Sequence, residues 1–344
     1  MVVTFLIGNG FDKQLGLDTG YDDFLKWYLA LEPEPDEDIE KFKIFLKSSK
    51  KSKWWADAEI AMGEYLADFN RNNIDTYYKN IRDFKEKLAI YLKEQQGLFI
   101  CNDEKKTAKM FRAFLANYHS DIVLNKHSRM FSKRKNTSYN FINFNYTNTL
   151  ANLIYYTKLD GNYVYKEANA VSSFVGSFGN LFHVHGTLDS FIIMGVNDKS
   201  QLMVNDESMI TDKMRRTVIK PITGSALGRT EMDDAEQLIR NSDILAVYGF
   251  SFGDSDKHWR DLVGEWLKIS GHLLVFFGHE ALSGINPLIP EDKLDYVDSM
   301  QNKVMEKIYK NEQDLNNSSI KERILIIDNT SLLGFNSTKV EVTV

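Results

Sequence analysis

The stretch VVTFLIGNGFD, residues 2–12, decides how this 344-residue chain folds. Its first six residues are mostly apolar and predict a strand buried on both faces, 2–7. Gly8 and Gly10 follow where a helix would begin. In a loop that binds a nucleotide phosphate, the first glycine permits a tight turn and the second lets the backbone approach a pyrophosphate. Many strand-to-helix turns need glycine for steric reasons alone, so a plain turn remains an alternative.

Later parts of the chain contain short apolar runs like the one that predicts the first strand. Helical patterns lie between the apolar runs, such as 21–31, whose apolar residues recur at helical spacing, and 233–241, which opens with acidic residues. This alternation predicts an α/β fold with a doubly wound, mostly parallel, Rossmann-like sheet of about six strands. Besides 2–7, the predicted strands are 139–144, 181–185, 243–249, 272–278 and 323–328.

One block, from about residue 32 to 135, contains no convincing strand. Its first residues, EPEPD at 32–36, predict a loop. We interpret the block as a helical insertion after the first strand–helix unit, within a single α/β nucleotide-binding domain that spans residues 1–344. It would serve as a lid over the site or as an interaction surface. The predicted helices are 37–48, 53–71, 73–96 and 104–125, with Trp54 and Trp55 in their core; the polar stretch 310–322 predicts a loop or a frayed helix.

The charge balance argues against nucleic acid as the main partner. The chain carries 42 Lys and Arg against 48 Asp and Glu, which gives a net charge of -6. One basic run, KHSRMFSKRK at 126–135, is more typical of a solvated loop than of a binding surface.

Cysteine content and hydropathy favour a cytoplasmic protein. Cys101 is the only cysteine, so no disulfide can form within the chain and a thiolate zinc cage is excluded. The apolar run at 2–7 is short and lacks a basic flank, unlike a signal peptide. No apolar run approaches the roughly 18 residues that a membrane span needs. We therefore expect a protein that neither enters a membrane nor holds a metal.

Polar residues directly follow several of the predicted strands. In an open α/β sheet, ligands bind outside the carboxyl ends of the strands. We call the residues that directly follow a strand its exit. A single polar exit is common, but several polar exits together, with a histidine among them, favour a nucleotide site. The exits are Gly8 to Asp12, Asn145 to Asn148, His185-Gly186, and Gly249 to Asp256.

The same exits belong to motifs that occur together in a known family. The motifs are Gly8-Asn9-Gly10-Phe11-Asp12 with Gly16-Leu17-x-Thr19-x-Tyr21-x-x-Phe24, Trp55-x-Asp57-x-Glu59, Phe144-Asn145-Tyr146-Thr147, His183-Val184-His185-Gly186, and Tyr248-Gly249-Phe250-Ser251-Phe252-Gly253-x-x-Asp256. In this order they resemble the AbiH-type bacteriophage abortive-infection proteins. The resemblance implies a defence role in bacteria, in which infection triggers growth arrest or death of the host cell.

That family is similar, more distantly, to sirtuin-like NAD-binding domains. Carried over residue by residue, the similarity implies site roles for Asn145, His185, and Gly249 with Ser251. Three features depart from the sirtuin-like pattern. Thr147 stands where Asp is common, the first loop is not Gly-Ala-Gly-x-Ser, and a single cysteine cannot build a four-cysteine zinc module. The resemblance therefore supports binding and cleavage of NAD more than protein deacylation.

The residue types suit this chemistry independently of the family. Splitting nicotinamide from ribose passes through an oxocarbenium-like transition state, as glycoside cleavage does. The amide of Asn145 can orient the attacking water or ribose hydroxyl, and His185 can take its proton. These two residues are our candidate catalytic groups.

The candidate NAD-binding residues come from two loops. In the first loop, the backbone amides of Gly8, Asn9, Gly10 and Phe11 are expected to hold the pyrophosphate, while Asp12 caps the helix or bonds a ribose hydroxyl. In the later loop, Gly249, Ser251 and Asp254 are expected to contact the other end of the dinucleotide.

Structural roles are alternatives for several of these residues. Asn145 would also suit the cap of a helix that begins near Thr147. His185 could end a strand and bond a backbone carbonyl, or pair with His183 on one strand face to hold a metal. Asp254 and Asp256 favour the cap of the helix that contains Trp259 and Leu262 over a site for a divalent ion.

The main functional hypothesis is an NAD glycohydrolase that lowers cellular NAD during phage infection. A module that senses a nucleotide without turnover and a metal-dependent nuclease are alternatives. A dehydrogenase is disfavoured, because Lys13 replaces the third glycine of the dinucleotide motif and no acidic strand end follows about 20 residues on. We expect a dinucleotide ligand, a phage-derived trigger or partner protein, and possible homo-oligomers.

Overall fold

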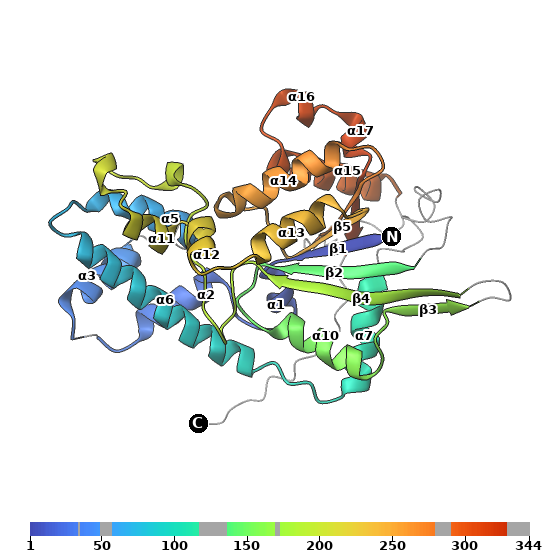
Figure 1. Ribbon diagram of the computed structural model, residues 1–344, viewed down its shortest axis with the longest axis horizontal. Coiled ribbons are helices and arrows are strands. Elements are labelled where there is room, and N and C mark those ends of the chain that lie inside the picture. Colours follow the sequence, from blue (N-terminus) through green and yellow to red (C-terminus); the bar gives the residue numbers. More distant parts are fainter. Residues whose placement is uncertain (34, 49–56, 117–135, 169–172, 279–289, 329–344) are drawn as a thin grey trace.

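A seven-stranded sheet forms the centre of the computed structural model (Figure 1), which describes residues 1–33, 35–48, 57–116, 136–168, 173–278 and 290–328. The strand order is β3-β4-β2-β1-β5-β6-β7. All neighbouring strands are parallel except β3, which is antiparallel to β4. The predicted α/β class with a mostly parallel sheet is therefore confirmed. The strands are β1 (Val2–Ile7), β2 (Thr137–Asn143), β3 (Tyr165–Ala168), β4 (Ser173–His183), β5 (Ile244–Tyr248), β6 (Leu273–Gly278) and β7 (Ile324–Asp328).

The edge of the sheet differs most from the sequence-based expectation. β3 was not predicted, because YKEA is short and half charged, and an edge strand needs no continuous apolar run. β4 begins at Ser173 rather than near residue 181, because its first half is rich in Ser and Gly. Gly176 is required there, since a Cβ would lie 2.5 Å from a ring atom of Tyr165 on β3.

Helices cover both faces of the sheet (Figure 1). On one face, Val3, Phe5 and Ile7 of β1 pack against α1 (Gly10–Gln14), α7 (Glu104–Ala116) and α10 (Thr149–Leu159). On the other face, Leu6 packs with α13 (Glu231–Arg240), α14 (Lys257–Lys268) and α15 (Pro290–Ile308). The alternation of side chains along β1 thus buries the strand on both sides.

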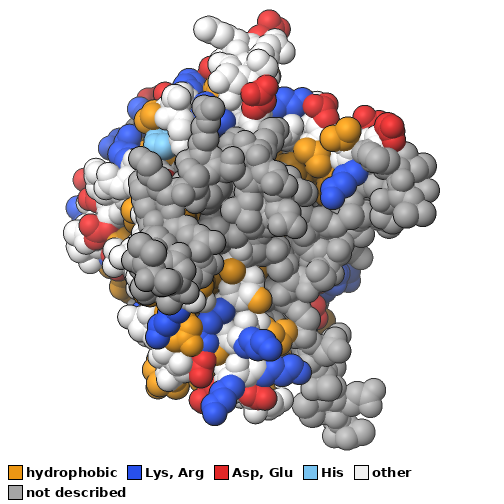
Figure 2. All heavy atoms as spheres, turned by 90° about the vertical axis from the view of Figure 1, so that its right-hand side faces the viewer, with side chains coloured by type: hydrophobic (Ala, Val, Ile, Leu, Met, Phe, Trp, Pro, Cys, Tyr) orange, Lys and Arg blue, Asp and Glu red, His pale blue; other side chains and the backbone are white. Residues whose placement is uncertain are grey.

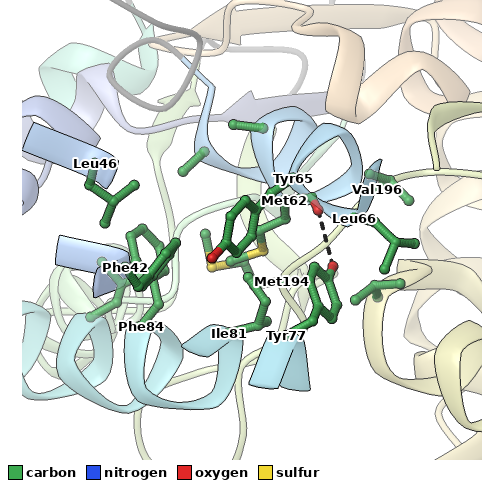
Figure 3. Close-up of a cluster of buried hydrophobic side chains, with 14 of the residues drawn as sticks. Phe42, Leu46, Met62, Tyr65, Leu66, Tyr77, Ile81, Phe84, Met194 and Val196 are labelled. Carbon is green, nitrogen blue, oxygen red and sulfur yellow. Dashed lines mark hydrogen bonds between the residues drawn. The ribbon is translucent and has the colours of Figure 1, made fainter. Parts of the chain in front are cut away.

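A second hydrophobic core lies away from the sheet, at the left of Figure 1. In it, Phe42 packs between Tyr65 and Phe84, and the hydroxyl of Tyr77 donates a hydrogen bond to the carbonyl of Met62 at 3.0 Å (Figure 3). We call this unit the helical lobe. It consists of α2 (Tyr21–Ala30), α3 (Glu37–Ser48), α5 (Ala58–Tyr65) and α6 (Ile74–Gly97), together with residues 188–226. These residues include α11 (Asp212–Val218), which contributes to the core, and α12 (Lys220–Ala226), which packs against α11.

The helical lobe differs from the insertion expected at residues 32–135. Helix α7 packs on the sheet instead, where Phe114 contacts the rings of Phe5, Phe11, Tyr248 and Phe277 at centroid distances of 4.9–6.1 Å. Residues 188–226 complete the lobe with apolar side chains such as Met194 and Val218. Apolar faces, rather than sequence proximity, decide which helices associate. Trp54, Trp55 and the basic run at 126–135 lie outside the described residues.

Short helices connect the main elements. The polar stretch 310–322 forms two of them, α16 and α17, and the side chains of Asn311 and Asn317 cap these two helices. No described helix combines the length and the apolarity that crossing a membrane requires. The short elements are η1 (Leu66–Asp68), η3 (Lys199–Gln201), η4 (Glu207–Met209), η5 (Asp254–Asp256), α16 (Glu312–Leu315) and α17 (Ser318–Lys321).

The sheet has a switch point beside its central strand. The chain leaves β1 for β2 on one side, and later adds β5 to the other side of β1. Connections that diverge in this way leave a crevice at the carboxyl ends of the two central strands. Gly8 and Gly249, which directly follow β1 and β5, therefore mark the place to look for a ligand site.

Candidate active site

A cavity of about 320 Å³ lies at this switch point, between the carboxyl edge of the sheet and the helical lobe. The sheet contributes the loops that follow β1, β2, β4 and β5, and the lobe contributes residues such as Tyr21, Asp57, Glu59 and Leu88. The volume falls in the lower part of the range of about 300–1,000 Å³ that is usual for small-molecule sites.

Most of the candidate site residues line this cavity. Those that do are Gly8, Asn9, Asp12, Asn145, His185, Gly249 and Ser251, whereas Gly10, Phe11 and Asp254 do not. The Phe11 side chain is fully buried in the core beneath the sheet. The Asp254 side chain is 75% exposed and binds Arg260 at 2.8 Å, outside the cavity. The structure therefore gives Phe11 a packing role and gives Asp254 a surface role.

The two glycine loops pack directly against each other. The amide of Gly8 donates to the carbonyl of Tyr248 at 3.0 Å, and the amide of Gly10 donates to that of Gly249 at 3.0 Å. The amide of Phe11 donates to the carbonyl of Gly8 at 2.9 Å. These three amides are already paired within the protein, so the expected pyrophosphate cradle does not fit the structure at Gly8, Gly10 and Phe11.

Asn145 is held by the first loop rather than by a helix. Its side-chain amide donates to the carbonyl of Gly8 at 3.1 Å, and its backbone amide donates to the side chain of Asn143 at 3.2 Å. Helix α10 begins only at Thr149, with Asn148 before it, so Asn145 does not cap that helix. A nearly buried amide fixed in this way suits the predicted orienting role.

His185 faces a carboxylate inside the cavity. It follows the end of β4, and Gly186 with a φ of +80° turns the chain directly after it. The Nε2 atom of His185 lies 3.3 Å from Oδ1 of Asp256, and the residue is 5% exposed. The side chain therefore meets a carboxylate, not a backbone carbonyl as the structural alternative would have it.

His183 has different surroundings, so the two histidines do not converge. Its Nδ1 lies 3.3 Å from the side-chain amide of Asn143, and burial lowers the pKa of His183 to about 4. Its backbone carbonyl accepts a hydrogen bond from Arg229 at 3.0 Å. Among the described residues, no three or more His, Cys, Asp and Glu side chains are grouped so as to hold a metal ion.

A buried charged cluster extends from His185 into the helical lobe. Oδ1 of Asp256 binds Nζ of Lys220 at 2.9 Å, and Lys220 binds Oε2 of Glu59 at 2.9 Å. The other oxygen of Glu59 accepts from the hydroxyl of Tyr146 at 3.2 Å and from the amide of Gly195 at 3.3 Å. The cluster thus joins the exits of β2, β4 and β5 to α5 and α12.

Asp256 was expected to cap α14 together with Asp254, and this prediction is wrong. Asp256 precedes α14, but its side chain makes no capping hydrogen bond. It turns to Lys220 and His185 instead, because two buried cationic or donor groups bind a carboxylate more strongly than one backbone amide does. Asp57, Glu59, Tyr146 and Asp256 appear in the family motifs, whereas Lys220 carried no signal, since a lone lysine before a proline is ordinary at a helix start.

The charges of the cluster stabilise one another. Burial alone would raise the pKa of Asp256, but Lys220 and His185 hold it well below its ordinary value. Burial would likewise lower the pKa of Lys220, but Asp256 and Glu59 raise it above its ordinary value. Near neutral pH, Asp256 is therefore ionised and able to fix the ring of His185.

Asp12 is a second buried carboxyl group of the cavity wall. The hydroxyl of Thr147 donates to its Oδ2 at 2.5 Å, and the hydroxyl of Thr149 donates to its Oδ1. Burial raises the pKa of Asp12 from an ordinary 3.8 to about 6, although these hydroxyls oppose the shift. Asp12 thus ties α1 to the loop after β2 and to the start of α10, and it does not cap its own helix.

We predict a pH-dependent gain in stability for Asp12→Asn. The folded-state pKa is raised, so ionisation disfavours the folded state as pH rises from about 4 to about 6. A shift of about two pKa units corresponds to about 3 kcal/mol. The free energy of unfolding of Asp12→Asn should therefore exceed that of wild type by about 3 kcal/mol more at pH 7 than at pH 4, so the variant is relatively more stable at the higher pH.

Denaturant titrations of both proteins at the two pH values measure this difference. Asp75→Asn is the matched control, because the Asp75 side chain is 91% exposed. Equal shifts for the two variants would contradict the assignment of a raised pKa to the buried carboxyl group of Asp12.

The arrangement defines a class: an α/β protein with a buried histidine–carboxylate pair in a cavity at the carboxyl edge of its parallel sheet. The family model for bacteriophage abortive infection AbiH matches residues 4–277. The chain therefore belongs to the AbiH family of bacteriophage abortive-infection proteins, and its role is in antiviral defence. The matched range contains every residue that lines the cavity. A comparison with curated proteins finds no significant match.

Proposed function

We propose that this protein binds NAD in the cavity and hydrolyses its nicotinamide–ribose bond, so that phage infection depletes the NAD of the host cytoplasm. The observation that carries the proposal is the contact of His185 with the ionised Asp256 inside a cavity at the switch point. The order of the six parallel strands, β4-β2-β1-β5-β6-β7, supports it, because dinucleotide-binding folds order their strands in this way. The sirtuin-like pattern of Asn145 and His185 supports it further.

His185 would act as the general base. An ionised carboxylate only accepts hydrogen bonds, so Nε2 of His185 carries the hydrogen that faces Asp256. Nδ1 is then left to take a proton from the attacking water, which the amide of Asn145 orients. The water oxygen bonds to C1′ of the ribose as the bond to the nicotinamide nitrogen breaks. ADP-ribose and nicotinamide leave, and His185 passes the proton to solvent.

The acidic lining suits one end of NAD better than the other. Asp57, Glu59 and Asp256 line the cavity, and burial together with Glu59 raises the pKa of Asp57. Negative groups stabilise the cationic nicotinamide ring and the oxocarbenium-like transition state. We place the pyrophosphate near Lys13, which lines the cavity with its side chain 48% exposed and lies 3.9 Å from Asp22 and 3.6 Å from Asp23.

Purified protein incubated with NAD tests the proposal. We expect release of nicotinamide and ADP-ribose, measured by chromatography, with greater release after addition of phage lysate if a phage-derived trigger is needed. Intact NAD under both conditions would refute the hydrolase. Tight binding of NAD without release would instead assign the protein to nucleotide sensing, in which the helical lobe responds to the ligand.

A metal-dependent nuclease has less support. Asp254 and Asp256 point to different partners, Arg260 and Lys220, rather than to a common ion. On the face drawn in Figure 2, acidic and basic side chains of the described residues are interspersed. A nucleic-acid surface would instead gather Lys and Arg. Metal-dependent degradation of DNA or RNA by the purified protein would reverse this preference.

A further inference from the structure

We infer that Lys220 is a positioning residue of the active site, which holds Asp256 against His185 and connects both residues to the helical lobe through Glu59. Lys220 would support the hydrolysis of NAD proposed above, so the catalytic part of this inference rests on the proposed function. The contacts that carry it are independent of the substrate.

The backbone of Lys220 is fixed before its side chain enters the site. Its amide donates to the carbonyl of Val196 at 2.9 Å, and the amide of Val196 donates to the carbonyl of Val218 at 2.8 Å. Pro221 follows at the start of α12, where a missing amide hydrogen costs nothing. Lys220 is only 3% exposed, so the side chain is directed inward from a rigid base.

The ammonium group of Lys220 bridges two parts of the molecule. One carboxylate that it binds, Asp256, belongs to the exit of β5 on the sheet, and the other, Glu59, belongs to α5 of the lobe. Glu59 is also bonded by Tyr146 and Gly195, so both of its oxygens are already engaged. Glu59 therefore serves to hold Lys220 in place.

Lys220 and His185 share a single oxygen of Asp256. Both approach Oδ1, at 2.9 Å and 3.3 Å. Lys220 therefore sets the direction of this oxygen as well as its charge. Because burial would otherwise raise the pKa of Asp256, loss of Lys220 would favour the protonated carboxyl group, which no longer serves only as an acceptor. Lys220 and His185 contact Asp256 directly, and its charge is also felt by Asp57, Tyr21 and Tyr146.

Lys220 acts on the reaction through Asp256 and not through the ligand. It does not belong to the residues that line the cavity. Its removal should therefore lower kcat and leave the affinity for NAD unchanged. The bridge also implies that His185 is positioned only while the lobe is docked on the sheet, since Lys220 of α12 and its partner Glu59 of α5 lie on the lobe side of the contact with Asp256.

Kinetics of three single variants test the role. For Lys220→Met we expect kcat for nicotinamide release to fall about 10²-fold, with the Kd of NAD unchanged and the acidic limb of the pH profile moved to higher pH. Lys220→Arg should recover most of the lost rate, because it keeps the charge. The control Lys257→Met removes a lysine that is 51% exposed and directly follows Asp256, and it should behave as wild type.

A spectroscopic measurement separates this inference from the proposed hydrolysis. In ¹⁵N NMR spectra without NAD, the Nε2 resonance of His185 should show a hydrogen-bonded N–H in wild type and lose this signature in Lys220→Met. If wild type releases no nicotinamide, the hydrolase fails but this measurement still decides the role of Lys220. If Lys220→Met does not fold, the double variant Glu59→Gln/Lys220→Met takes its place in both experiments, because it keeps the net charge of the cluster. A folded variant with the resonance and the rate of wild type would overturn the inference.

Discussion

His185→Ala should lower the rate of nicotinamide release about 10²–10⁴-fold, which is the usual contribution of a general base. The imidazole is the basic group that Asp256 fixes inside the cavity, and alanine leaves no acceptor for the proton of the attacking water. The fold should survive, because Asp256 remains paired with Lys220 at 2.9 Å. Initial rates at saturating NAD, together with circular dichroism of both proteins, measure the effect.

His258→Ala serves as the control for this experiment. His258 lies on α14, and its Nε2 binds Glu236 at 2.8 Å, away from the residues that line the cavity. Its removal should leave nicotinamide release unchanged. If both variants kept the full rate, a histidine base at this site would be ruled out.

Gly249→Ala should lower the free energy of unfolding by more than about 3 kcal/mol. Gly249 has a φ of +65°, a conformation that costs other residues about 1–2 kcal/mol. A Cβ would also lie 2.5 Å from the amide nitrogen of Phe11 and 2.7 Å from Cα of Gly10. These are backbone atoms of the packed first loop, so neither can move aside cheaply.

Gly228→Ala separates the two contributions. Gly228 has a similar φ of +70°, but a Cβ there would meet nothing within 4 Å. It should cost only about 1 kcal/mol, which is the conformational part alone. Denaturant titrations of the two variants give the comparison. A cost at Gly249 no larger than at Gly228 would show that the two glycine loops do not need their close approach.

The sheet was largely predictable because buried parallel strands leave a strong signal. The six apolar runs correspond to β1, β2, β4, β5, β6 and β7, with differences mainly at their ends. β3 left no such signal, because an edge strand of four residues buries little. The sequence did not show that α7 packs on the sheet or that residues 188–226 belong to the helical lobe. These associations depend on which apolar faces meet in three dimensions, and sequence order does not encode that.

The site was only partly predictable. Because Asn145, His185 and Gly249 each follow a predicted strand, we expected them to lie together, and all three line one cavity. The glycines of the first loop were ambiguous in sequence, and their close contact with the β5 exit explains them without a phosphate. Lys220 could not have been found, because its importance comes from two carboxylates that lie 161 and 36 residues away along the chain.

A crystal structure of His185→Ala grown with NAD would test the central claim most directly. The variant should bind NAD without cleaving it. We predict that the nicotinamide ribose occupies the cavity, with C1′ beside the Asn145 amide and the space vacated by the imidazole, and that the pyrophosphate lies toward Lys13. Well-ordered NAD bound elsewhere on the protein, with the cavity free of it, would contradict the account.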